Sequence, residues 1–404
     1  DPRDLGYEPY ISKWLRERIV PDVDILTDLF PKYVTKAVNY VFLGEIDGNI
    51  VSLPKLTIPT NNLSAVRQLC RMLEALLPEA KQVSNRLVIE SAFVFAVVWS
   101  IGSLILEESR GTFDNLVRRC CGWNQHSGAS TVAGSLPGVE STLYEYVFDV
   151  DNAEWCSWKS LVQPYVPPLD RKFSKILVPT VDTVRSTWIL ETMTQALCPV
   201  LFVGESGTAK TVVIQNFLRD LDTEKSTVLS IAFSSRTNSM DVQRNLEENV
   251  DKRTKDTYGP LAGKKLLVFI DDLNMPKVDI YGTQQPIALL KLLIDKGNIF
   301  DRGKDLNAKY LRDVYFISAM APPGGARNPV DPRFVSLFCV FNITIPSQES
   351  LQLIFNSILK AHMSGNFGEE MLAVVEQITR MTLGLYESIQ IHLPPTPSKF
   401  HYVF

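Results

Sequence analysis

At residues 200–211 the chain reads Val200-Leu201-Phe202-Val203-Gly204-Glu205-Ser206-Gly207-Thr208-Ala209-Lys210-Thr211, four apolar residues followed by a glycine-containing loop. Residues 212–221 continue as a predicted helix. A strand, such a loop and a helix form the setting of a P-loop, whose backbone N–H groups and helix N-terminus surround phosphate oxygens. We therefore expect this segment to bind the phosphates of a nucleotide. The alternative is a chance glycine turn before a helix.

Three residues at the end of this loop carry specific expectations. Lys210 is expected to reach the β- and γ-phosphates, and the Thr211 hydroxyl to ligate Mg²⁺. The glycine usually found just before the lysine is Ala209 here. Its methyl group is tolerated if the local φ is negative, so Ala209 places the loop geometry in question.

A second apolar run, Leu266-Leu267-Val268-Phe269-Ile270, ends in the carboxylates Asp271 and Asp272. A buried strand ending in acidic residues is the second half of many P-loop sites, and Asp271 would hold Mg²⁺ through water. Asp272 would orient the attacking water. Many related ATPases use glutamate there, and aspartate is one methylene, about 1.5 Å, shorter. The alternative is an ordinary acidic strand end.

The pattern around these motifs predicts an α/β domain between two helical regions. Apolar strands are predicted at 200–203, 228–233, 266–270 and 314–319, alternating with helices as in a parallel sheet. Helical periodicity appears earlier at 12–20, 25–40, 62–77 and 87–106, and later at 351–363 and 368–388. The predicted organisation is a helical domain over 1–110, a loop or insert over 111–146, the α/β domain over 147–346 and the start of another helical domain over 347–404.

Composition limits the classes of partner. The 404 residues are 45% hydrophobic and 21% charged with a net charge of −4, which indicates a globular protein without a broad nucleic-acid or anionic-membrane footprint. Six cysteines without a repeated spacing indicate reduced thiols in the cytosol. Cys120, Cys121 and His126 could suggest a metal site, but a plain loop is favoured.

The apolar run at 87–106 is about long enough to span a bilayer. Glu90 lies inside it and Glu107 and Glu108 follow it directly, and a carboxylate in a lipid-facing helix is costly. We therefore predict a buried core helix, with a membrane span as the alternative.

Several motifs in combination resemble the heavy chain of dynein, an AAA+ microtubule motor. Besides residues 204–211, they are Tyr258-Gly259-Pro260, Phe269-Ile270-Asp271-Asp272-Leu273-Asn274-Met275-Pro276, Met320-Ala321-Pro322-Pro323-Gly324-Gly325-Ala326-Arg327-Asn328 and Asp331-Pro332-Arg333-Phe334. The third AAA+ module of an axonemal form is the most similar part. Asp4-Leu5-Gly6-Tyr7-Glu8-Pro9-Tyr10 resembles the end of the second module.

The resemblance implies a P-loop AAA+ domain with a parallel sheet flanked by helices, preceded by an all-helical AAA+ small domain. Residues 1–110 would end the second module, 147–346 would be the large domain of the third, and 347–404 would begin its truncated small domain. In the family, the segment that contains Val178, Pro179 and Thr183 packs on adenine; a plain linker is the alternative.

The resemblance implies roles for two arginines. Arg333 matches the family's candidate arginine finger, which would reach the nucleotide of the preceding module; a solvated surface charge is the alternative. Arg327 is a weaker candidate and is expected to be structural.

The function implied is an ATP- or ADP-binding regulatory module with Mg²⁺ in an axonemal dynein ring, which gates communication between the main ATPase and the microtubule-binding stalk. Hydrolysis would be slow, with Lys210, Asp272 and Arg333 in catalytic roles. The alternative is a structural nucleotide holder without appreciable turnover, favoured by Ala209, Asp272 and Ala321. The isolated chain is expected to have negligible ATPase activity, because residues that complete the site would lie beyond Phe404.

The implied partners are neighbouring AAA+ modules of the same heavy chain and, through the full motor, intermediate chains, light chains and microtubules. No nucleic-acid or membrane partner is expected. The implied location is the cytoplasm and the cytoskeleton, in the axoneme of a cilium or flagellum.

Overall fold

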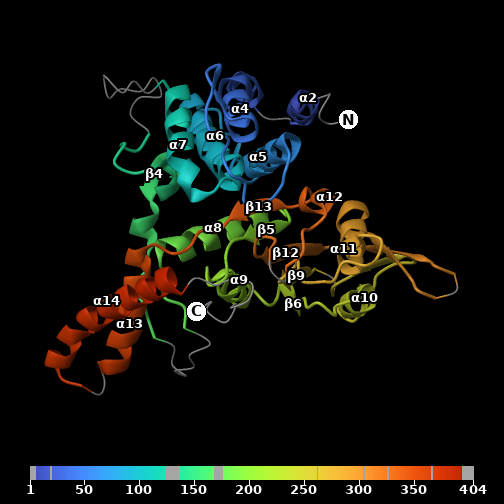
Figure 1. Cartoon of the computed structure of the whole chain (residues 1–404). Coiled ribbons are helices and arrows are strands. Elements are labelled where there is room, and N and C mark those ends of the chain that lie inside the picture. Colours follow the sequence, from blue (N-terminus) through green and yellow to red (C-terminus); the bar gives the residue numbers. More distant parts are fainter. Residues whose placement is uncertain are drawn as a thin grey trace. The chain divides into compact units, whose positions relative to one another are not determined.

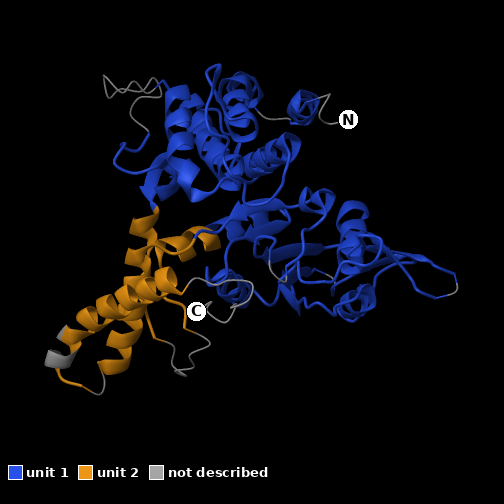
Figure 2. Cartoon of the chain, viewed as in Figure 1, with its two compact units in different colours: residues 1–157, 188–344 blue, residues 158–187, 345–404 orange. Residues whose placement is uncertain are grey.

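The computed structural model describes residues 6–18, 21–122, 136–167, 176–261, 263–303, 305–324, 327–364 and 367–393. The chain forms two compact units, shown in Figure 2. The first combines residues 1–157 with 188–344, and the second combines residues 158–187 with 345–404.

The first unit begins with the predicted helical domain (Figure 1). Its elements are α2 (Glu8–Glu17), α3 (Val23–Leu29), the π-helical turn η1 (Phe30–Val34), α4 (Thr35–Leu43), α5 (Asn62–Leu76), α6 (Arg86–Ser100), η3 (Gly102–Leu104) and α7 (Glu107–Cys120). The single helix predicted at 25–40 is therefore three segments. Pro31 has no N–H to donate, and it lies in the first turn of η1, where the hydrogen-bond pattern changes.

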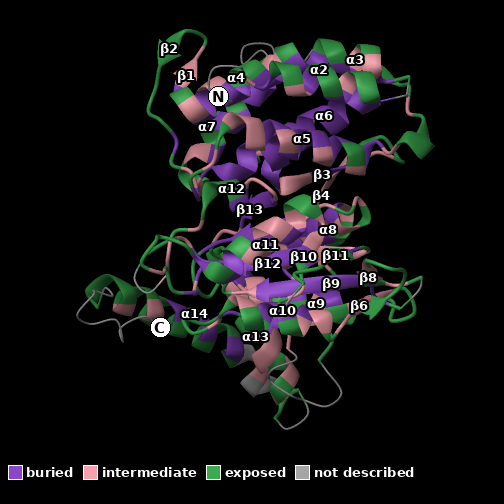
Figure 3. Cartoon of the chain, turned by 90° about the vertical axis from the view of Figure 1, so that its right-hand side faces the viewer, coloured by how far each residue is buried: buried purple, intermediate pink, exposed green. Residues whose placement is uncertain are grey.

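Helix α6 is the core of this domain, as predicted for the apolar run at 87–106. The stretch Arg86–Leu104 is long and apolar enough to cross a membrane, but 94% of its most apolar window is buried inside the fold. Its carboxylate, Glu90, accepts a hydrogen bond from Tyr33 Oη at 2.7 Å and forms an ion pair with Lys32. A buried charge is thus paired, as burial requires. In Figure 3 the buried residues gather in α5, α6 and the strands of the large sheet.

Helix α7 corrects the prediction of a loop or insert over 111–146. The helix continues to Cys120, with Arg110, Phe113, Leu116 and Val117 buried at helical spacing. Gly111 and the polar residues of this stretch concealed that periodicity in the sequence. A short antiparallel hairpin follows later, formed by β3 (Tyr146–Asp149) and β4 (Glu154–Ser157).

The α/β domain contains a five-stranded sheet in the order β13-β5-β12-β9-β6, with every pairing parallel. Its strands are β5 (Val200–Val203), β6 (Ser226–Ala232), β9 (Lys265–Asp271), β12 (Val314–Met320) and β13 (Cys339–Asn342). The helices of this part of the chain are α8 (Val181–Gln195), α9 (Lys210–Arg219), α10 (Ser239–Glu247), α11 (Gln285–Lys296) and the short α12 (Pro332–Val335). The predicted α/β class and its four strands are confirmed; β13 was not predicted.

A smaller sheet in the order β10-β11-β8-β7 was also missed. Its strands are β7 (Asp251–Lys252), β8 (Thr257–Gly259), β10 (Asn298–Phe300) and β11 (Ala308–Leu311). Strands of two to four residues give no periodicity that a sequence pattern can detect.

The second unit contains the start of α8, together with the helix pair α13 (Gln348–Met363) and α14 (Glu369–His392). Helices were predicted at 351–363 and 368–388, so the structure confirms both and extends each. Ser347 caps α13, because its side-chain oxygen accepts a hydrogen bond from the Ser350 N–H.

The helical domain packs against the edge strand β13 within the first unit. The Val340 N–H donates to Gln68 Oε1 at 2.9 Å, and Gln68 Nε2 donates to the Val340 carbonyl at 2.9 Å. The Gln68 amide, on α5, thereby bonds the N–H and the carbonyl of Val340, which a further strand would otherwise pair at this edge of the sheet. Asn342 Nδ2 also donates to the Ile105 carbonyl at 3.2 Å.

Candidate functional site

The carboxyl ends of three neighbouring parallel strands form the candidate site. Strand β5 leads into residues 204–209, β9 ends at Asp271, and β12 leads into residues 321–327. Such edges of open parallel sheets are where ligands bind. The Gly204 N–H donates to the Met320 carbonyl at 3.3 Å, so the first residue of the loop after β5 is bonded to the last residue of β12.

The loop at 204–209 has the shape of a phosphate cradle. A Cβ on Gly204 would lie 2.2 Å from the Ile343 carbonyl oxygen, so this position admits only glycine. Gly207 has a φ of +83° and faces open space, with nothing within 4 Å of the position of a Cβ. Buried Thr208 braces the loop, because its hydroxyl donates to the Glu205 carbonyl at 2.9 Å. These features fit a bound polyphosphate.

Ala209 has a left-handed backbone, with φ 59° and ψ 14°. The condition under which its methyl group would be tolerated, a negative φ, is therefore not met. A non-glycine residue in this region is strained, at a cost of roughly 1–2 kcal/mol. Ala209 is the N-cap of α9 and supplies no side-chain hydrogen bond, which leaves first-turn N–H groups available to an anion.

The Lys210 ammonium lies against its own loop. Nζ donates to the carbonyls of Gly204 at 2.7 Å and Glu205 at 2.6 Å, and to Thr208 Oγ1 at 2.9 Å. Burial lowers the pKa of Lys210 to about 8, and the positive charge of Arg327 adds to the shift. A phosphate would replace neutral carbonyl partners with a charged one, which is the stronger interaction.

The two predicted metal ligands are brought together. Thr211 Oγ1 donates to Asp271 Oδ1 at 3.1 Å. Burial raises the pKa of Asp271; the hydrogen bond from Thr211 works against that rise, and the charge of Asp272 adds to it. The Thr211 hydroxyl and the half-buried Asp271 carboxylate both offer oxygen ligands. Mg²⁺ binds oxygen ligands of this kind together with substrate phosphates, so these residues fit the ion.

Asp272 turns the chain at the end of β9. Its φ is 52°, again left-handed, and its N–H donates to Asp271 Oδ1 at 3.0 Å. The side chain is exposed to solvent, so the predicted water-orienting carboxylate is at the site edge and not enclosed. Next to it, buried Asn274 donates to the Ala321 carbonyl at 2.8 Å and ties the loops after β9 and β12 together.

Arg327, which the sequence predicts to be structural, contacts the phosphate loop. Its Nη2 donates to Ser206 Oγ in the phosphate loop at 3.0 Å. Its Nε is buried and has no hydrogen-bond partner among the residues that the structure describes. Gly325 and Ala326, which precede it in the motif, lie outside the described residues. The available signal was topological, because the loops after adjacent parallel strands meet at one sheet edge.

The residues predicted to contact adenine belong to the second unit, whereas the phosphate loop belongs to the first. Val178 is buried, and Pro179 precedes the start of α8. The Thr180 N–H donates to Thr183 Oγ1 at 2.8 Å, and the Thr183 N–H donates to Thr180 Oγ1 at 3.3 Å. This reciprocal cap orders the segment, as a rigid platform requires.

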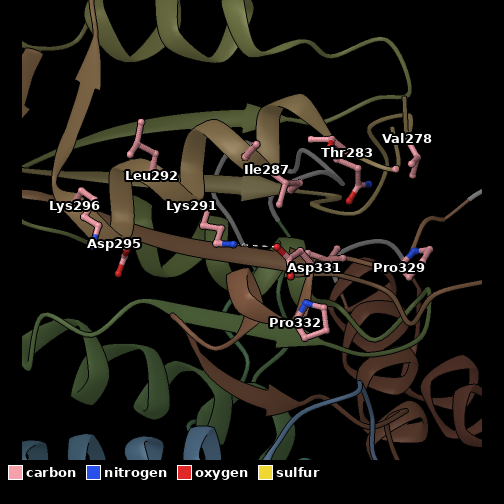
Figure 4. A pocket seen from close by; sticks show the side chains of 14 residues that line it. Val278, Thr283, Ile287, Lys291, Leu292, Asp295, Lys296, Pro329, Asp331 and Pro332 are labelled. Carbon is pink, nitrogen blue, oxygen red and sulfur yellow. Dashed lines mark hydrogen bonds and ion pairs between the residues drawn. The ribbon is translucent and has the colours of Figure 1, made fainter. Parts of the chain in front are cut away.

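Asp331 and Pro332, which directly precede Arg333 in the chain, line a cavity of about 750 Å³, shown in Figure 4. Asp331 Oδ2 pairs with Lys291 Nζ at 3.1 Å, and Asp331 Oδ1 accepts the Arg333 N–H at 2.9 Å. The backbone of Arg333 is thus fixed while its side chain is exposed. Its role as a finger toward another module stays a prediction.

No group of three or more His, Cys, Asp or Glu side chains that could hold a metal ion occurs among the described residues. Cys121 is buried, and its Sγ lies 3.4 Å from Tyr33 Oη. His126, the third residue weighed as a ligand with Cys120 and Cys121, lies outside the described residues.

Comparison with known proteins finds two family regions along the chain. Residues 26–160 match the dynein heavy chain AAA lid domain, and residues 165–346 match the P-loop containing dynein motor region. The chain is 50% identical over 411 residues to the dynein-1-alpha heavy chain of the flagellar inner arm I1 complex of Chlamydomonas reinhardtii. It is also 50% identical over 408 residues to human dynein axonemal heavy chain 10, and 34% identical over 411 residues to human dynein axonemal heavy chain 2. Each alignment covers 100% of this chain and 9% of the relative, so the chain spans about 9% of the length of these proteins.

Proposed function

The chain belongs to the family of axonemal dynein heavy chains, as a segment with an AAA lid and a P-loop AAA region, and from this premise we propose that it is a regulatory ATP-binding module of the motor ring. The P-loop family implies nucleotide binding. The axonemal and flagellar relatives imply that the chain works in the axoneme of a cilium or flagellum.

The observation that carries the proposal is the contact between Thr211 and Asp271 beside Lys210. In the proposed site, Lys210 binds the β- and γ-phosphates, and the N–H groups at the start of α9 bind phosphate oxygens. Thr211 and Asp271 hold Mg²⁺, which when bound would offset negative charge on the phosphates. The family resemblance assigns the platform for the base to Val178, Pro179 and Thr183, which belong to the second unit.

We propose slow hydrolysis at this site. Asp272 accepts a hydrogen bond from a water molecule whose oxygen attacks the γ-phosphorus, the bond from that phosphorus to the β-phosphate oxygen breaks, and ADP and phosphate leave. The exposure and short side chain of Asp272 are the physical reasons for a low rate, because a solvent-exposed carboxylate holds the water less firmly.

The module assignment is also part of the proposal. Residues 1–110 would complete the second AAA+ module, and the P-loop domain would be the third. Arg333 would then reach the nucleotide of the preceding module, which its exposed side chain on a fixed backbone supports. Neighbouring modules of the same heavy chain would be the direct partners, with intermediate chains, light chains and microtubules engaged through the whole motor.

A second candidate function is a structural nucleotide holder that binds ATP or ADP without appreciable turnover. The strained backbone of Ala209 and the exposed carboxylate of Asp272 favour it. Ala321, where related modules carry a polar residue, also favours it, since an alanine side chain cannot orient water.

The two functions are separated in an axonemal dynein motor that contains this chain, by comparing Lys210→Ala with Asp272→Asn. If turnover at this site regulates the motor, both variants slow microtubule gliding. If the site only holds nucleotide, Lys210→Ala slows gliding and Asp272→Asn does not. Lys225→Ala, a substitution at an 83% exposed lysine of the same unit, is the matched control. Gliding unaffected by Lys210→Ala would contradict both functions.

A further inference from the structure

We propose that Arg327 binds the terminal phosphate of the nucleoside triphosphate held by its own P-loop, so that this module discriminates triphosphate from diphosphate in cis. The proposal rests on the proposed function, because it requires a nucleotide at residues 204–211. It adds a phosphate-binding residue to that site, supplied by the loop after β12.

The backbone of Arg327 is held firmly at the phosphate loop. The Arg327 N–H donates to the Gly324 carbonyl at 3.0 Å, and the Gly324 N–H donates to the Arg327 carbonyl at 3.1 Å. The next residue, Asn328, donates through its N–H to the Asn274 carbonyl at 3.0 Å and through Nδ2 to the Pro276 carbonyl at 2.9 Å. These bonds anchor Arg327 to the segment that follows the Asp271–Asp272 pair.

The guanidinium has hydrogen-bonding capacity that the protein leaves unused. Its Nη2 contacts the Ser206 hydroxyl, and its buried Nε has no partner among the described residues. A buried donor without an acceptor is costly, and phosphate oxygens are the acceptors that match the planar fork of arginine in pairs. A phosphate group next to Ser206 would therefore accept hydrogen bonds from both Nε and Nη2 of Arg327.

The position along the loop points to the last phosphate of the chain. Ser206 precedes Lys210, whose ammonium is expected at the β- and γ-phosphates, and the charge of Arg327 acts on that ammonium. Two cations held close together without a paired anion repel each other, whereas a polyphosphate between them attracts both. Lys210 approaches the β- and γ-phosphates from the phosphate loop, and Arg327, which comes from the loop after β12, adds a second cation at the terminal phosphate.

Arg327 and Arg333 thus have separate roles, although they lie close together in the sequence. Arg327 contacts the phosphate loop of its own domain, and Arg333 follows Asp331 beside the cavity at α11 and has an exposed side chain. In this assignment Arg327 binds the nucleotide of its own module, and Arg333 reaches the nucleotide of the preceding module.

The test compares ATP and ADP affinity by titration with Mg²⁺ for the unchanged chain, Arg327→Gln and Arg327→Lys. Arg327→Gln is expected to weaken ATP binding by about 10- to 100-fold and ADP binding by less than about threefold, since a charge-assisted phosphate contact is lost only for ATP. Arg327→Lys keeps the charge without the fork and is expected to lose about threefold to tenfold for ATP alone. It also serves as the second variant if Arg327→Gln fails to fold.

Two further variants exclude a merely structural role. Ser206→Ala removes the hydrogen bond to Arg327 but not the guanidinium, and is expected to change ATP and ADP affinity by the same factor. Arg302→Gln removes an arginine that instead bonds Gln243 and Ser239, and is expected to leave the ATP-to-ADP affinity ratio unchanged. Equal losses of ATP and ADP affinity in both Arg327 variants would overturn the proposal. Failure of the unchanged chain to bind either nucleotide would instead contradict the proposed function.

Discussion

Ala209 places a methyl group at a backbone position of the phosphate loop that favours glycine. Its backbone is left-handed at φ 59°, where glycine has no penalty and alanine is strained. The same loop keeps glycine at Gly204, where a Cβ would clash with the backbone, and at Gly207, where φ is +83°. Strain at functional loops is common, and here it lies directly before the phosphate-binding lysine.

Ala209→Gly is expected to raise the free energy of unfolding by about 0.5–1 kcal/mol. The relief of backbone strain exceeds the extra entropy that glycine gives the unfolded chain. Urea denaturation measures the change. Ala288→Gly, at an exposed position inside α11, is the control and should lower stability by about 0.5–1 kcal/mol. A loss of similar size at both positions would contradict the strain assigned to Ala209.

Nucleotide affinity is expected to fall as pH rises through about 8, the pKa of Lys210. Phosphate binding needs the charged ammonium, and its protonated fraction drops about tenfold between pH 7 and pH 9. Titration of ATP in EDTA, which keeps Mg²⁺ out of the measurement, should show an affinity loss of about that factor. A flat profile between pH 7 and 9 would mean that Lys210 is charged throughout this range.

The same group changes stability in the opposite direction. In the unfolded chain Lys210 keeps its ordinary pKa of 10.5, so between about pH 8 and 10.5 the unfolded state binds more protons than the folded state. The contribution of this group to the free energy of unfolding therefore rises with pH in that window.

At the residue scale, the sequence identified the groups whose chemistry depends on type and spacing. Thr211 and Asp271 lie together as predicted, because β5 and β9 both pair in parallel with β12 and end at the same edge of the sheet. The strand order predicts that the loops of Ser206 and Arg327 meet, but the positive φ of Ala209 and the individual hydrogen bond from Arg327 to Ser206 could not be predicted from the sequence. Both depend on how loops from three strands meet, which no local pattern encodes.

At the scale of elements, the Gln68 side chain makes the backbone hydrogen bonds that a further strand would make at the edge of the sheet. Its amide bonds both the N–H and the carbonyl of Val340 at 2.9 Å, from a helix of the other domain. Strand β13 then pairs with β5, and the Ile343 N–H donates to the Val203 carbonyl directly before the phosphate loop. The helical domain is thereby connected to the strand that carries Gly204.

Gln68→Leu is expected to lower the free energy of unfolding by about 1–3 kcal/mol. The substitution leaves the buried N–H of Val340 without its acceptor, which costs about 1–3 kcal/mol, while the Val340 carbonyl keeps the hydrogen bond that Ser103 Oγ donates at 3.2 Å. Chemical denaturation measures the loss. Gln285→Leu, at an exposed position of α11, is the control and should change stability by less than about 0.5 kcal/mol. Equal effects at both sites would show that the amide pair contributes nothing.

Elements with long apolar runs were predictable, and short or interrupted ones were not. Strands β5, β9 and β12 are continuous apolar segments buried in the sheet. Strand β13 has four residues, as β5 does, but no glycine-containing loop and predicted helix follow it to mark it as a strand. The π-helical turn at Pro31 and the continuation of α7 past Gly111 likewise depend on packing that the pattern does not contain.

At the scale of the whole molecule, the proposed module depends on neighbours for catalysis. An arginine finger contributes about 10³–10⁵ in rate at such sites, and Arg333 is proposed to serve another module. We therefore expect the isolated chain to bind ATP and release phosphate no faster than its Lys210→Ala variant, measured at saturating Mg·ATP. Robust turnover that disappears in Lys210→Ala would show a self-sufficient site and contradict the shared-site account.

The central claim is that residues 204–211 form a working nucleotide site, and an equilibrium titration of the chain with a fluorescent ATP analogue tests it most directly. Lys210→Ala is expected to weaken binding about 100-fold, because a charge-assisted contact to phosphate is lost in a half-buried site. Lys225→Ala, which removes an 83% exposed ammonium, should bind as the unchanged chain does. Equal affinity of the unchanged chain and Lys210→Ala would contradict the claim.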